Sequence, residues 1–376
     1  MVVIAFIVTL IYTILILRFV FSFDNVKIYY KTKDLAYKTR FSIIIPFRNE
    51  EEHLEKLLNS LANLNYPRTH FQVLMIDDNS TDNSLQIIER FRMDYINLDI
   101  TAIPNTSFSK SPKKDAITTA IRHTTYDWII TTDADCSVSK NWLDLIDDFI
   151  QNQSPRMIVA PLTYNIDFEF LDGFQALDVL SLQSATISSF GLRNPFMCNG
   201  ANLIYEKSLF NELNGFEGNM QLASGDDIFF MEKVATHFPD KLMYLKSKDA
   251  LVYSQPELSF TSLIHQRMRW AGKTSAYRNT FAKGIALSIF MMNFIIVLGY
   301  FLAVFGLFQW TVLISILLIK LIVDVLLIRK SAKLFEQLNY LKYYPLSAIF
   351  YPFFSVFIVF LSLVTKYNWK GRRFKK

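Results

Sequence analysis

The segment Asp127-Trp-Ile-Ile-Thr-Thr-Asp-Ala-Asp-Cys136 decides the fold class of this 376-residue chain. Its apolar residues 128–130, followed by β-branched threonines, predict a buried strand of a parallel sheet. The strand ends in Asp133 and Asp135, and ligands of open α/β sheets bind at the carboxyl ends of strands. Two carboxylates one residue apart can bind a hard divalent cation that keeps positions open for phosphate oxygens. An isolated D-x-D is more often a helix cap beside a solvated acid, so the prediction depends on the surrounding sequence.

The residues before this segment alternate between strand and helix patterns. Apolar strands are predicted at residues 41–46, 71–76 and 98–103, and amphipathic helices at 49–61, after 82 and at 112–122. Asn49-Glu-Glu-Glu52 is expected to open the first helix, because its acidic residues suit the positive end of the helix dipole. The alternation predicts an α/β fold with a doubly wound, Rossmann-like parallel sheet. Asp77 and Asp78 then follow its second strand, at the same sheet edge as Asp133 and Asp135.

The pattern continues less regularly after this segment. Further strands are predicted at residues 156–163 and 199–205, and a helix at 228–237 follows Gly225-Asp226-Asp227. Residues 168–192 carry apolar side chains at helical spacing, interrupted by serine and glutamine. They predict either an amphipathic helix on a membrane surface or a plain core helix.

The composition is too apolar for an ordinary soluble domain, with 51% hydrophobic and 19% charged residues. Four apolar runs each approach the roughly 20 residues that cross a bilayer. They are residues 2–23, 284–308, 311–328 and 345–364. The first lacks the basic start and cleavage site of a signal peptide, which favours a membrane anchor. The two cysteines are too few for a disulfide framework or a zinc site. The net charge of +5 gathers near the apolar runs without aromatic interleaving, so lipid head groups are expected as its partners rather than nucleic acid.

These patterns divide the chain into five parts. We predict an N-terminal anchor (1–23), a basic juxtamembrane linker (24–40), a globular domain with interfacial helices (41–283), three C-terminal membrane segments (284–365) and a basic tail (366–376). The basic linker places the globular domain in the cytoplasm, against the cell (inner) membrane. Four full spans would put the basic tail outside, against the same rule. The hairpin joined by Gln309-Trp310 is therefore suspected of being re-entrant or interfacial.

Five short motifs occur along the chain in a fixed order. They are Phe41-Ser-Ile-Ile-Ile-Pro-Phe-Arg-Asn-Glu50, Ile76-Asp-Asp-Asn-Ser-Thr-Asp82, Asp133-Ala-Asp135, Gly225-Asp-Asp227 and Gln266-Arg-Met-Arg-Trp270. Together they resemble family 2 of the inverting glycosyltransferases, in particular its membrane-bound members with D-x-D and Q-x-x-R-W motifs. The resemblance covers about residues 41–275. It implies a GT-A fold, a nucleotide-sugar donor, a divalent cation (Mg²⁺ or Mn²⁺) and one displacement at the anomeric carbon with inversion.

The resemblance assigns the first three motifs to the donor. Asp135, with Asp133, would hold the cation that neutralises the leaving diphosphate. Asp133 would also border the donor, and Asp77 or Asp78 would bind the uracil or the ribose. The remaining expected donor-binding residues are Pro46, Arg48, Glu50 and Lys113. Capping and turn formation are the structural alternative for these acids. A solvated helix start is the alternative for Lys113, because Pro112 stands where the family usually has glycine.

The resemblance assigns the last two motifs to the acceptor side. Asp227 matches the catalytic base, and Asp226 precedes it where the family more often has glutamate. The alternative is that both acids simply begin a helix. Gln266, Arg269 and Trp270 would bind the diphosphate and stack against the acceptor, since guanidinium groups suit phosphates. Packing of Trp270 at a membrane interface is the alternative there.

These inferences predict a membrane-anchored inverting glycosyltransferase at the cytoplasmic face. The expected donor is a UDP-sugar and the expected acceptor a lipid-linked or glycan hydroxyl. A processive polysaccharide synthase is the alternative enzyme, and an inactive scaffold that binds nucleotide sugars is the alternative outside enzymes. The sequence indicates no oligomeric state.

Lys320 and Asp324 form a separate feature, four residues apart in the third apolar run. Unpaired charges at that depth are costly, so the two are expected to pair and to face protein. A structural ion pair and a border to the acceptor's path both remain open.

Overall fold

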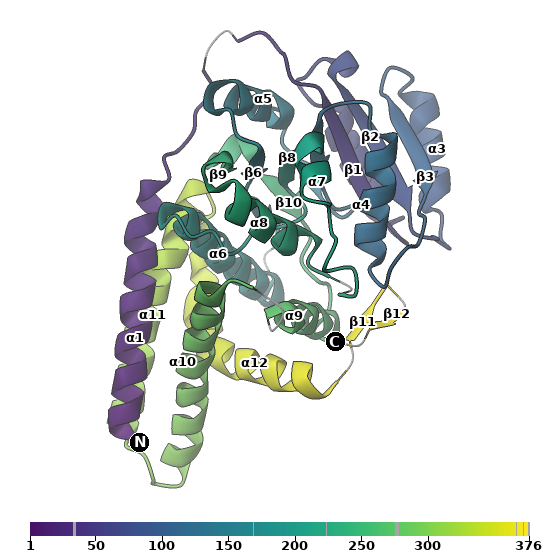
Figure 1. Cartoon of the computed structure of the whole chain (residues 1–376). Coiled ribbons are helices and arrows are strands. Elements are labelled where there is room, and N and C mark those ends of the chain that lie inside the picture. The colour runs from purple at the N-terminus through teal and green to yellow at the C-terminus, as the bar shows by residue number, and fades with distance from the viewer. Residues whose placement is uncertain are drawn as a thin grey trace. The chain divides into compact units, whose positions relative to one another are not determined.

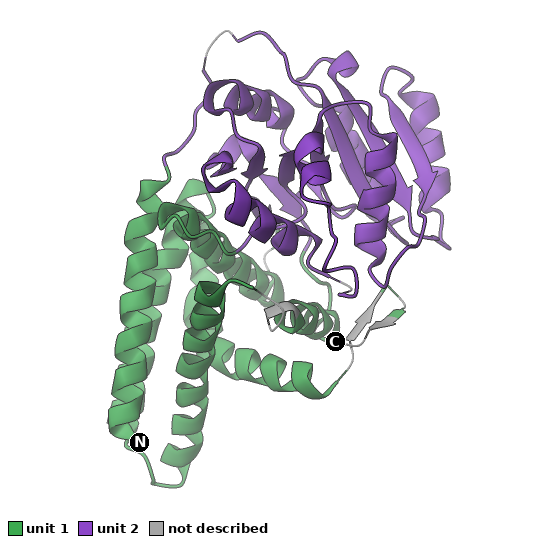
Figure 2. Ribbon diagram, viewed as in Figure 1, with its two compact units in different colours: residues 1–26, 166–196, 256–376 green, residues 27–165, 197–255 purple. Residues whose placement is uncertain are grey.

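A sheet-based unit and a helical unit share this chain (Figure 2). Unit 1 comprises residues 1–26, 166–196 and 256–376, and unit 2 comprises residues 27–165 and 197–255. The computed structural model describes residues 1–32, 35–167, 169–222, 224–274, 278–365, 367–370 and 372–374. The side chains of residues 273, 274, 367–369, 373 and 374 lie outside that description.

Unit 2 is built on a seven-stranded sheet with the order β3-β2-β1-β4-β8-β6-β9. Its strands are β1 Phe41–Phe47, β2 Phe71–Asp77, β3 Ile100–Pro104, β4 Trp128–Thr131, β6 Met157–Val159, β8 Leu203–Glu206 and β9 Leu242–Tyr244. The strands β3, β2, β1 and β4 are parallel, as the sequence predicts. The all-parallel prediction is wrong for β8, which runs antiparallel to both β4 and β6. The sheet is therefore mixed, with a Rossmann-like parallel half.

The helices of unit 2 are α2 Leu54–Ala62, α3 Ser84–Asp94, α4 Pro112–His123, α5 Trp142–Gln153, α7 Lys207–Glu212 and α8 Asp226–His237. The prediction that residues 49–52 open the first helix is wrong, because α2 begins at Leu54. Asn49 has a left-handed backbone with φ 51°. Its N–H donates to Ser80 Oγ (3.1 Å), and the N–H of Glu51 donates to Asp82 Oδ2 (3.0 Å). The left-handed backbone of Asn49 does not fit a helix, and these hydrogen bonds hold residues 49–51 as a loop against the segment after β2.

The strand predicted at residues 156–163 is divided in the structure. The part before Pro161 is β6 in the large sheet. The part after it, β7 Leu162–Tyr164, joins a second sheet with β5 Ser137–Val138 and β10 Val252–Ser254. Proline has no N–H to donate to a ladder, which explains why the strand ends there.

The predicted linker is bound along α5 rather than free. Asp148 accepts hydrogen bonds from the Tyr29 hydroxyl (2.6 Å) and the Thr32 N–H (3.1 Å). Asp147 accepts from the backbone of Lys38 and Thr39. Burial, and next the bond to Asp148, raise the pKa of Tyr29 to about 12, so the phenol remains a donor. Residues 27–32 and 35–40 are thus held against α5 by its buried carboxylates.

Unit 1 contains six helices among its described residues (Figure 1). They are α1 Val2–Ser22, α6 Phe170–Gly191, α9 Phe260–Thr274, α10 Thr280–Val304, α11 Trp310–Leu334 and α12 Tyr344–Val364. Short 3₁₀ turns follow α1 (η1, Phe23–Asn25) and α11 (η5, Leu338–Tyr343). By length and composition, α1, α10, α11 and the segment Leu338–Val364 could each cross a membrane.

The helix α6 packs inside unit 1. Ser184 Oγ donates to Leu327 O (2.9 Å), and Ser331 Oγ donates to Leu180 O (2.7 Å). Gly191 allows α6 to meet the end of α1, since a Cβ there would lie 1.9 Å from Ser22 O. Most of the α6 side chains are buried, which matches the core-helix alternative for this segment.

Lys320 and Asp324 form the expected ion pair, with Nζ 2.5 Å from Oδ2. The hydroxyl of Tyr12 on α1 donates to the other carboxylate oxygen of Asp324 (2.7 Å). The ammonium of Lys320 lies over the rings of Tyr12 and Tyr351, 5.6 Å from each centroid. Lys320, Asp324 and Tyr351 also line a cavity of about 50 Å³, which has room for a few water molecules. The pair therefore joins three helices of unit 1.

Candidate active site

The loops after β1 and β2 meet at the carboxyl edge of the sheet, where the donor-binding residues were predicted. Phe47 pairs with Asp77 in the β1–β2 register. Arg48 Nη1 donates to the carbonyls of Asp78 (2.5 Å) and Asn79 (2.7 Å). The structure thus brings together Pro46, Arg48, Glu50, Asp77 and Asp78.

Asp77 and Asp78 have different surroundings. Asp77 Oδ1 accepts from the Ser80 N–H (2.9 Å), the turn role that was the alternative for this residue. Asp78 is buried, and its Oδ1 accepts from Asn105 Nδ2 (3.0 Å). Asn105 follows β3 and also donates to the carbonyl of Pro112, at the start of α4 (3.3 Å). Sequence analysis missed Asn105, although an Asn after an edge strand is a signal for such a role.

Lys113 lies at the centre of a cluster of acids. Its Nζ is 2.5 Å from Asp133 Oδ1 and 3.7 Å from Asp226 Oδ2. Burial alone would lower the pKa of Lys113, but the charges of Asp133, Asp226 and Asp227 outweigh it and raise the pKa. Lys113 is therefore a charged member of this cluster and not a solvated helix start.

Asp133 and Asp135 follow β4 at the same edge. Asp135 Oδ2 accepts from Ser254 Oγ (3.1 Å), which belongs to β10. Burial, and next the negative charge of Asp133, raise the pKa of Asp135. Repulsion between two neighbouring carboxylates is relieved by a cation between or beside them.

The oxygen donors of this loop fit a hard divalent cation such as Mg²⁺ or Mn²⁺. Among the described residues, no group of three or more His, Cys, Asp or Glu could hold a metal ion by itself. A cation bound to Asp133 and Asp135 would therefore need further oxygens. The diphosphate of a donor would supply such oxygens.

Asp226 and Asp227 both lie in the first turn of α8, where the helix dipole favours negative charge. Gly225 precedes them with φ 87°, and a Cβ there would lie 2.5 Å from the Phe229 ring. Asp226 faces Lys113, whereas Asp227 Oδ1 accepts from the Ile228 N–H (2.8 Å). The two acids thus have distinct positions at the helix start.

Gly200, at this cluster, and Lys114, next to Lys113 in the sequence, are two further residues that sequence analysis missed. A Cβ on Gly200 would lie 3.0 Å from Asp226 Oδ2 and 3.3 Å from Lys113 Nζ. Lys114 is fully buried, and its Nζ donates to the carbonyls of Asn219 (2.7 Å) and Leu222 (2.9 Å). Lys114 thereby fixes the loop that leads to Gly225.

The Q-x-x-R-W residues lie on α9, which belongs to unit 1. Gln266 Nε2 donates to Glu257 Oε1 (2.8 Å). The buried Arg267 donates to Asp178 Oδ2 on α6 (2.8 Å) and lies over the Trp270 ring, 4.1 Å from its centroid. Gln266, Arg269 and Trp270 are each partly exposed. The guanidinium of Arg267 thus fixes the orientation of the motif through Asp178 and Trp270. Residue 267 is one of the two x positions of Q-x-x-R-W, so the motif itself does not point to this role.

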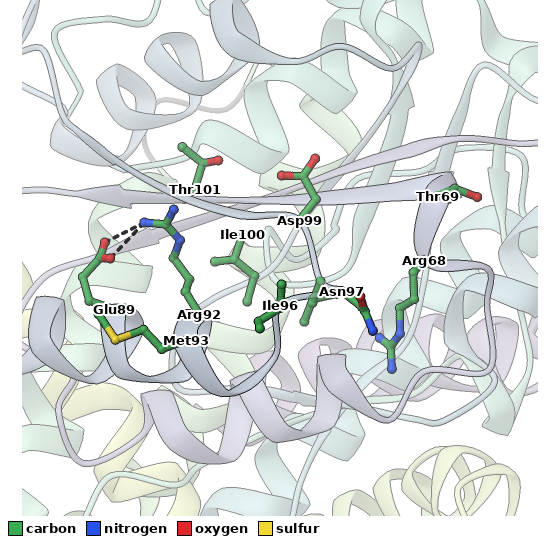
Figure 3. A pocket seen from close by; sticks show the side chains of 11 residues that line it. Arg68, Thr69, Glu89, Arg92, Met93, Ile96, Asn97, Asp99, Ile100 and Thr101 are labelled. Atoms are coloured by element: carbon green, nitrogen blue, oxygen red, sulfur yellow. Dashed lines mark hydrogen bonds and ion pairs between the residues drawn. The ribbon is translucent and has the colours of Figure 1, made fainter.

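A cavity of about 640 Å³ lies elsewhere on unit 2 (Figure 3). Its lining includes Arg92 and Met93 at the end of α3, Ile96 just after that helix, and Ile100 at the start of β3. This is the amino end of the strand, and none of the predicted site residues lines the cavity. We therefore place the candidate active site at the acid cluster.

The fold and the acid cluster define a class of proteins, the glycosyltransferases with a Rossmann-like sheet. Profiles of two groups match this chain: "Glycosyl transferase family 2" over residues 42–213 and "Glycosyl transferase family group 2" over residues 128–328. The chain belongs to glycosyl transferase family group 2, whose profile covers more than half of it.

Curated relatives match parts of this chain. Poly(ribitol-phosphate) β-N-acetylglucosaminyltransferase TarS of Staphylococcus aureus is 33% identical over 123 residues, 33% of this chain and 21% of TarS. Glycosyltransferase AglE of Haloferax volcanii is 23% identical over 51% of this chain and 60% of its own. β-Monoglucosyldiacylglycerol synthase of Nostoc is 31% identical over 27% of this chain and 21% of its own. The chain therefore spans about a fifth of TarS and of the synthase.

A solved structure matches almost the whole chain. Mannosyltransferase PcManGT of Pyrobaculum calidifontis, in complex with GDP-Man and Mn²⁺, has a TM-score of 0.60 with 18% identity, covering 96% of each chain. This likeness concerns the fold. Together with the family profiles it confirms the expected GT-A-like architecture, here with a mixed sheet.

Proposed function

We propose that this protein is a membrane-anchored, metal-dependent inverting glycosyltransferase that transfers a sugar from a nucleotide sugar to a hydroxyl acceptor. The observation that carries the proposal is the cluster of Lys113, Asp133, Asp135 and Asp226 at the carboxyl edge of a family 2 sheet. TarS and the Nostoc synthase, whose names specify transferred sugars, support the reaction class.

The donor side is proposed to form at the loops after β1, β2 and β4. Asp77 or Asp78 would bind the uracil or the ribose, and the Lys113 ammonium would stabilise phosphate oxygens as the diphosphate leaves. A cation held by Asp133 and Asp135 would neutralise the same developing charge. Lys113 already forms an ion pair with Asp133. When the donor and the cation bind, Asp133 would turn to the cation and the Lys113 ammonium would turn to the phosphate oxygens.

The acceptor side is proposed to use Asp227 as the base. Its carboxylate would take the proton of the acceptor hydroxyl as that oxygen bonds to the anomeric carbon and the nucleoside diphosphate departs. Gln266, Arg269 and Trp270 would contact the diphosphate and the acceptor. A lipid acceptor is supported by the four helices that could span a membrane and by the diacylglycerol in the name of the Nostoc relative. The cytoplasmic face of the cell membrane is the proposed location, because residues 27–40, which follow α1 in the sequence, are basic.

A screen of nucleotide sugars tests this function. Purified protein in lipid vesicles is incubated with each UDP- and GDP-sugar, with Mg²⁺ or Mn²⁺ and a lipid extract. We expect one donor, a UDP-sugar, to release its nucleoside diphosphate and to label one lipid or glycan product. Binding of the donor with neither release nor labelled product would support the inactive-scaffold alternative.

Gly200→Ala is expected to lower the transfer rate while leaving the fold intact. The added methyl group meets Asp226 Oδ2 and Lys113 Nζ and must displace one of them. A misplacement of 1 Å at a catalytic group can cost about 10²-fold in rate, so a shift of a few tenths of an ångström should cost up to about tenfold. Gly284→Ala is the matched control, because a Cβ there meets nothing within 4 Å. Equal transfer rates of the two variants would contradict the placement of Gly200 at the site.

The Lys320–Asp324 pair is expected to be structural. The triple variant Lys320→Leu, Asp324→Leu, Tyr12→Phe removes both charges and the Tyr12 hydroxyl that donates a hydrogen bond to Asp324. Its free energy of unfolding and its rate of sugar transfer should therefore stay near those of the wild type. Asp324→Leu alone leaves the Lys320 ammonium buried without a counter-charge and should cost about 3–5 kcal/mol. Thermal unfolding in detergent and transfer assays measure both. If the triple variant loses transfer to lipid but still hydrolyses the donor, the pair borders the acceptor's path instead.

A further inference from the structure

The helices α1, α10 and α11 of unit 1 run side by side, whereas α12 runs across them (Figure 1). An ion pair between Asp24, just after α1, and Lys330 on α11 (2.5 Å) joins the carboxyl-terminal ends of these two helices. Thus α1 and α11, which pack directly on each other, run in the same direction, and α10 runs the opposite way beside them. The arrangement gives three full-length helices suited to crossing a bilayer.

The second half of α12 stays beside α9. Phe354 and Ile358 of α12 form one buried cluster with Leu263 and Met268 of α9. At the end of α12, Thr365 Oγ1 lies 4.0 Å from Met268 Sδ. A helix that crossed the bilayer would carry its end away from α9, but α12 remains next to it over its whole second half.

The chain itself limits where α9 can lie. Only five residue steps separate Gln255, the last residue of unit 2, from Phe260, the first residue of α9. Such a connection reaches at most about 18 Å, which is less than the roughly 30 Å of bilayer hydrocarbon. The start of α9 therefore belongs to the side of the membrane that holds unit 2. Gln266, Arg267 and Arg269 would be costly in hydrocarbon, so the part of α9 around Met268 belongs to that side as well. The end of α12, which contacts Met268, belongs there with it.

The exposed face of α12 is apolar throughout. It includes Leu346 (59% exposed), Ile349 (51%), Phe357 (50%), Phe360 (50%) and Leu363 (63%). The helix Tyr344–Val364 contains no charged residue. Such a face requires a hydrocarbon environment, and an apolar surface of this kind marks contact with lipid. The tail that follows is basic at residues 366, 370, 372, 373, 375 and 376, which favours the cytoplasmic side.

From these observations we propose that α12 does not cross the membrane. It lies within the leaflet nearest unit 2, where its exposed face contacts lipid acyl chains, and it returns the basic tail to the side of unit 2. The protein then has three spans, α1, α10 and α11, with its N-terminus on the opposite side. This topology rests on the membrane anchoring in the proposed function. It makes α12, and not the α10–α11 hairpin suspected from the sequence, the segment that fails to span.

Labelling of single cysteines in sealed vesicles of known orientation tests the proposal. The native Cys136 and Cys198 are buried, so labelling of the wild-type protein gives the background signal. Three variants report one position each: Thr365→Cys after α12, Gln309→Cys between α10 and α11, and Asn97→Cys in an exposed loop of unit 2. A membrane-impermeant maleimide is expected to label Thr365→Cys and Asn97→Cys from one side and Gln309→Cys from the other.

Digestion by external trypsin gives a second readout that does not need a cysteine variant. The basic tail should be cleaved only in vesicles whose unit 2 faces outward. Labelling of Thr365→Cys from the same side as Gln309→Cys, or tail cleavage only in the opposite vesicles, would establish four spans and overturn the proposal. Recovery of the protein outside the membrane fraction would instead refute the anchoring. Neither readout requires catalytic activity.

Discussion

Asp227→Asn is expected to lower the rate of sugar transfer by about 10²–10⁴-fold, the usual contribution of a general base. Donor and cation binding should persist, because asparagine keeps the shape of the side chain and can still accept from the Ile228 N–H. Transfer rates and donor affinity, measured separately, distinguish a lost proton acceptor from a lost binding site.

Asp226→Asn is the matched control, one residue away in the same helical turn. Its carboxylate lies 3.7 Å from Lys113 Nζ, so its loss should change donor affinity more than the rate at saturating donor. If Asp226→Asn is inactive and Asp227→Asn is active, the base is Asp226, and the match between this chain and the family motif is off by one residue.

Asp135→Ala is expected to abolish turnover, by about 10³-fold or more, while the fold remains. Neutralising a departing diphosphate contributes several kcal/mol to catalysis, and each 1.4 kcal/mol is about tenfold. Removing Asp135 also relieves its repulsion with Asp133, so the free energy of unfolding should not fall greatly. EDTA should inactivate the wild type reversibly.

Ser254→Ala provides the control for Asp135→Ala. It removes the hydroxyl that donates to Asp135 Oδ2 (3.1 Å) but leaves both carboxylates in place. We expect it to keep most of the activity and to need somewhat more Mg²⁺ or Mn²⁺. Full activity of the wild type in EDTA, or of Asp135→Ala, would remove the cation from the mechanism.

The sequence predicts the first half of unit 2 well because its signals are local. Each parallel strand is a short apolar run that ends in polar residues, and β1, β2 and β4 follow this pattern closely. The local sequence pattern does not show whether β8 runs parallel or antiparallel to its neighbours. Its residues Leu203, Ile204 and Tyr205 are all buried, and a strand buried on both faces reads the same in either direction.

Much of the site depends on contacts between residues distant in sequence, which a local pattern cannot show. Asp133 and Asp226 meet Lys113 only in the folded chain, and Gly200 matters because two charged groups approach it. The acids after residue 49 match the start of a helix, yet the left-handed backbone of Asn49, whose N–H donates to Ser80 Oγ, places them in a loop. Hydropathy likewise identifies α12 but not its direction across the neighbouring helices.

Transfer of radiolabelled sugar is the decisive measurement for the proposed function. Wild-type protein in lipid vesicles is given a labelled nucleotide sugar, a divalent cation and extracted lipids, in parallel with Asp227→Asn. We expect the wild type to release nucleoside diphosphate and to move the label into a lipid or glycan product with inverted anomeric configuration, whereas Asp227→Asn binds the donor but forms no product. Product formation at equal rates by both proteins, or a product with retained configuration, would contradict an inverting transfer with Asp227 as the base.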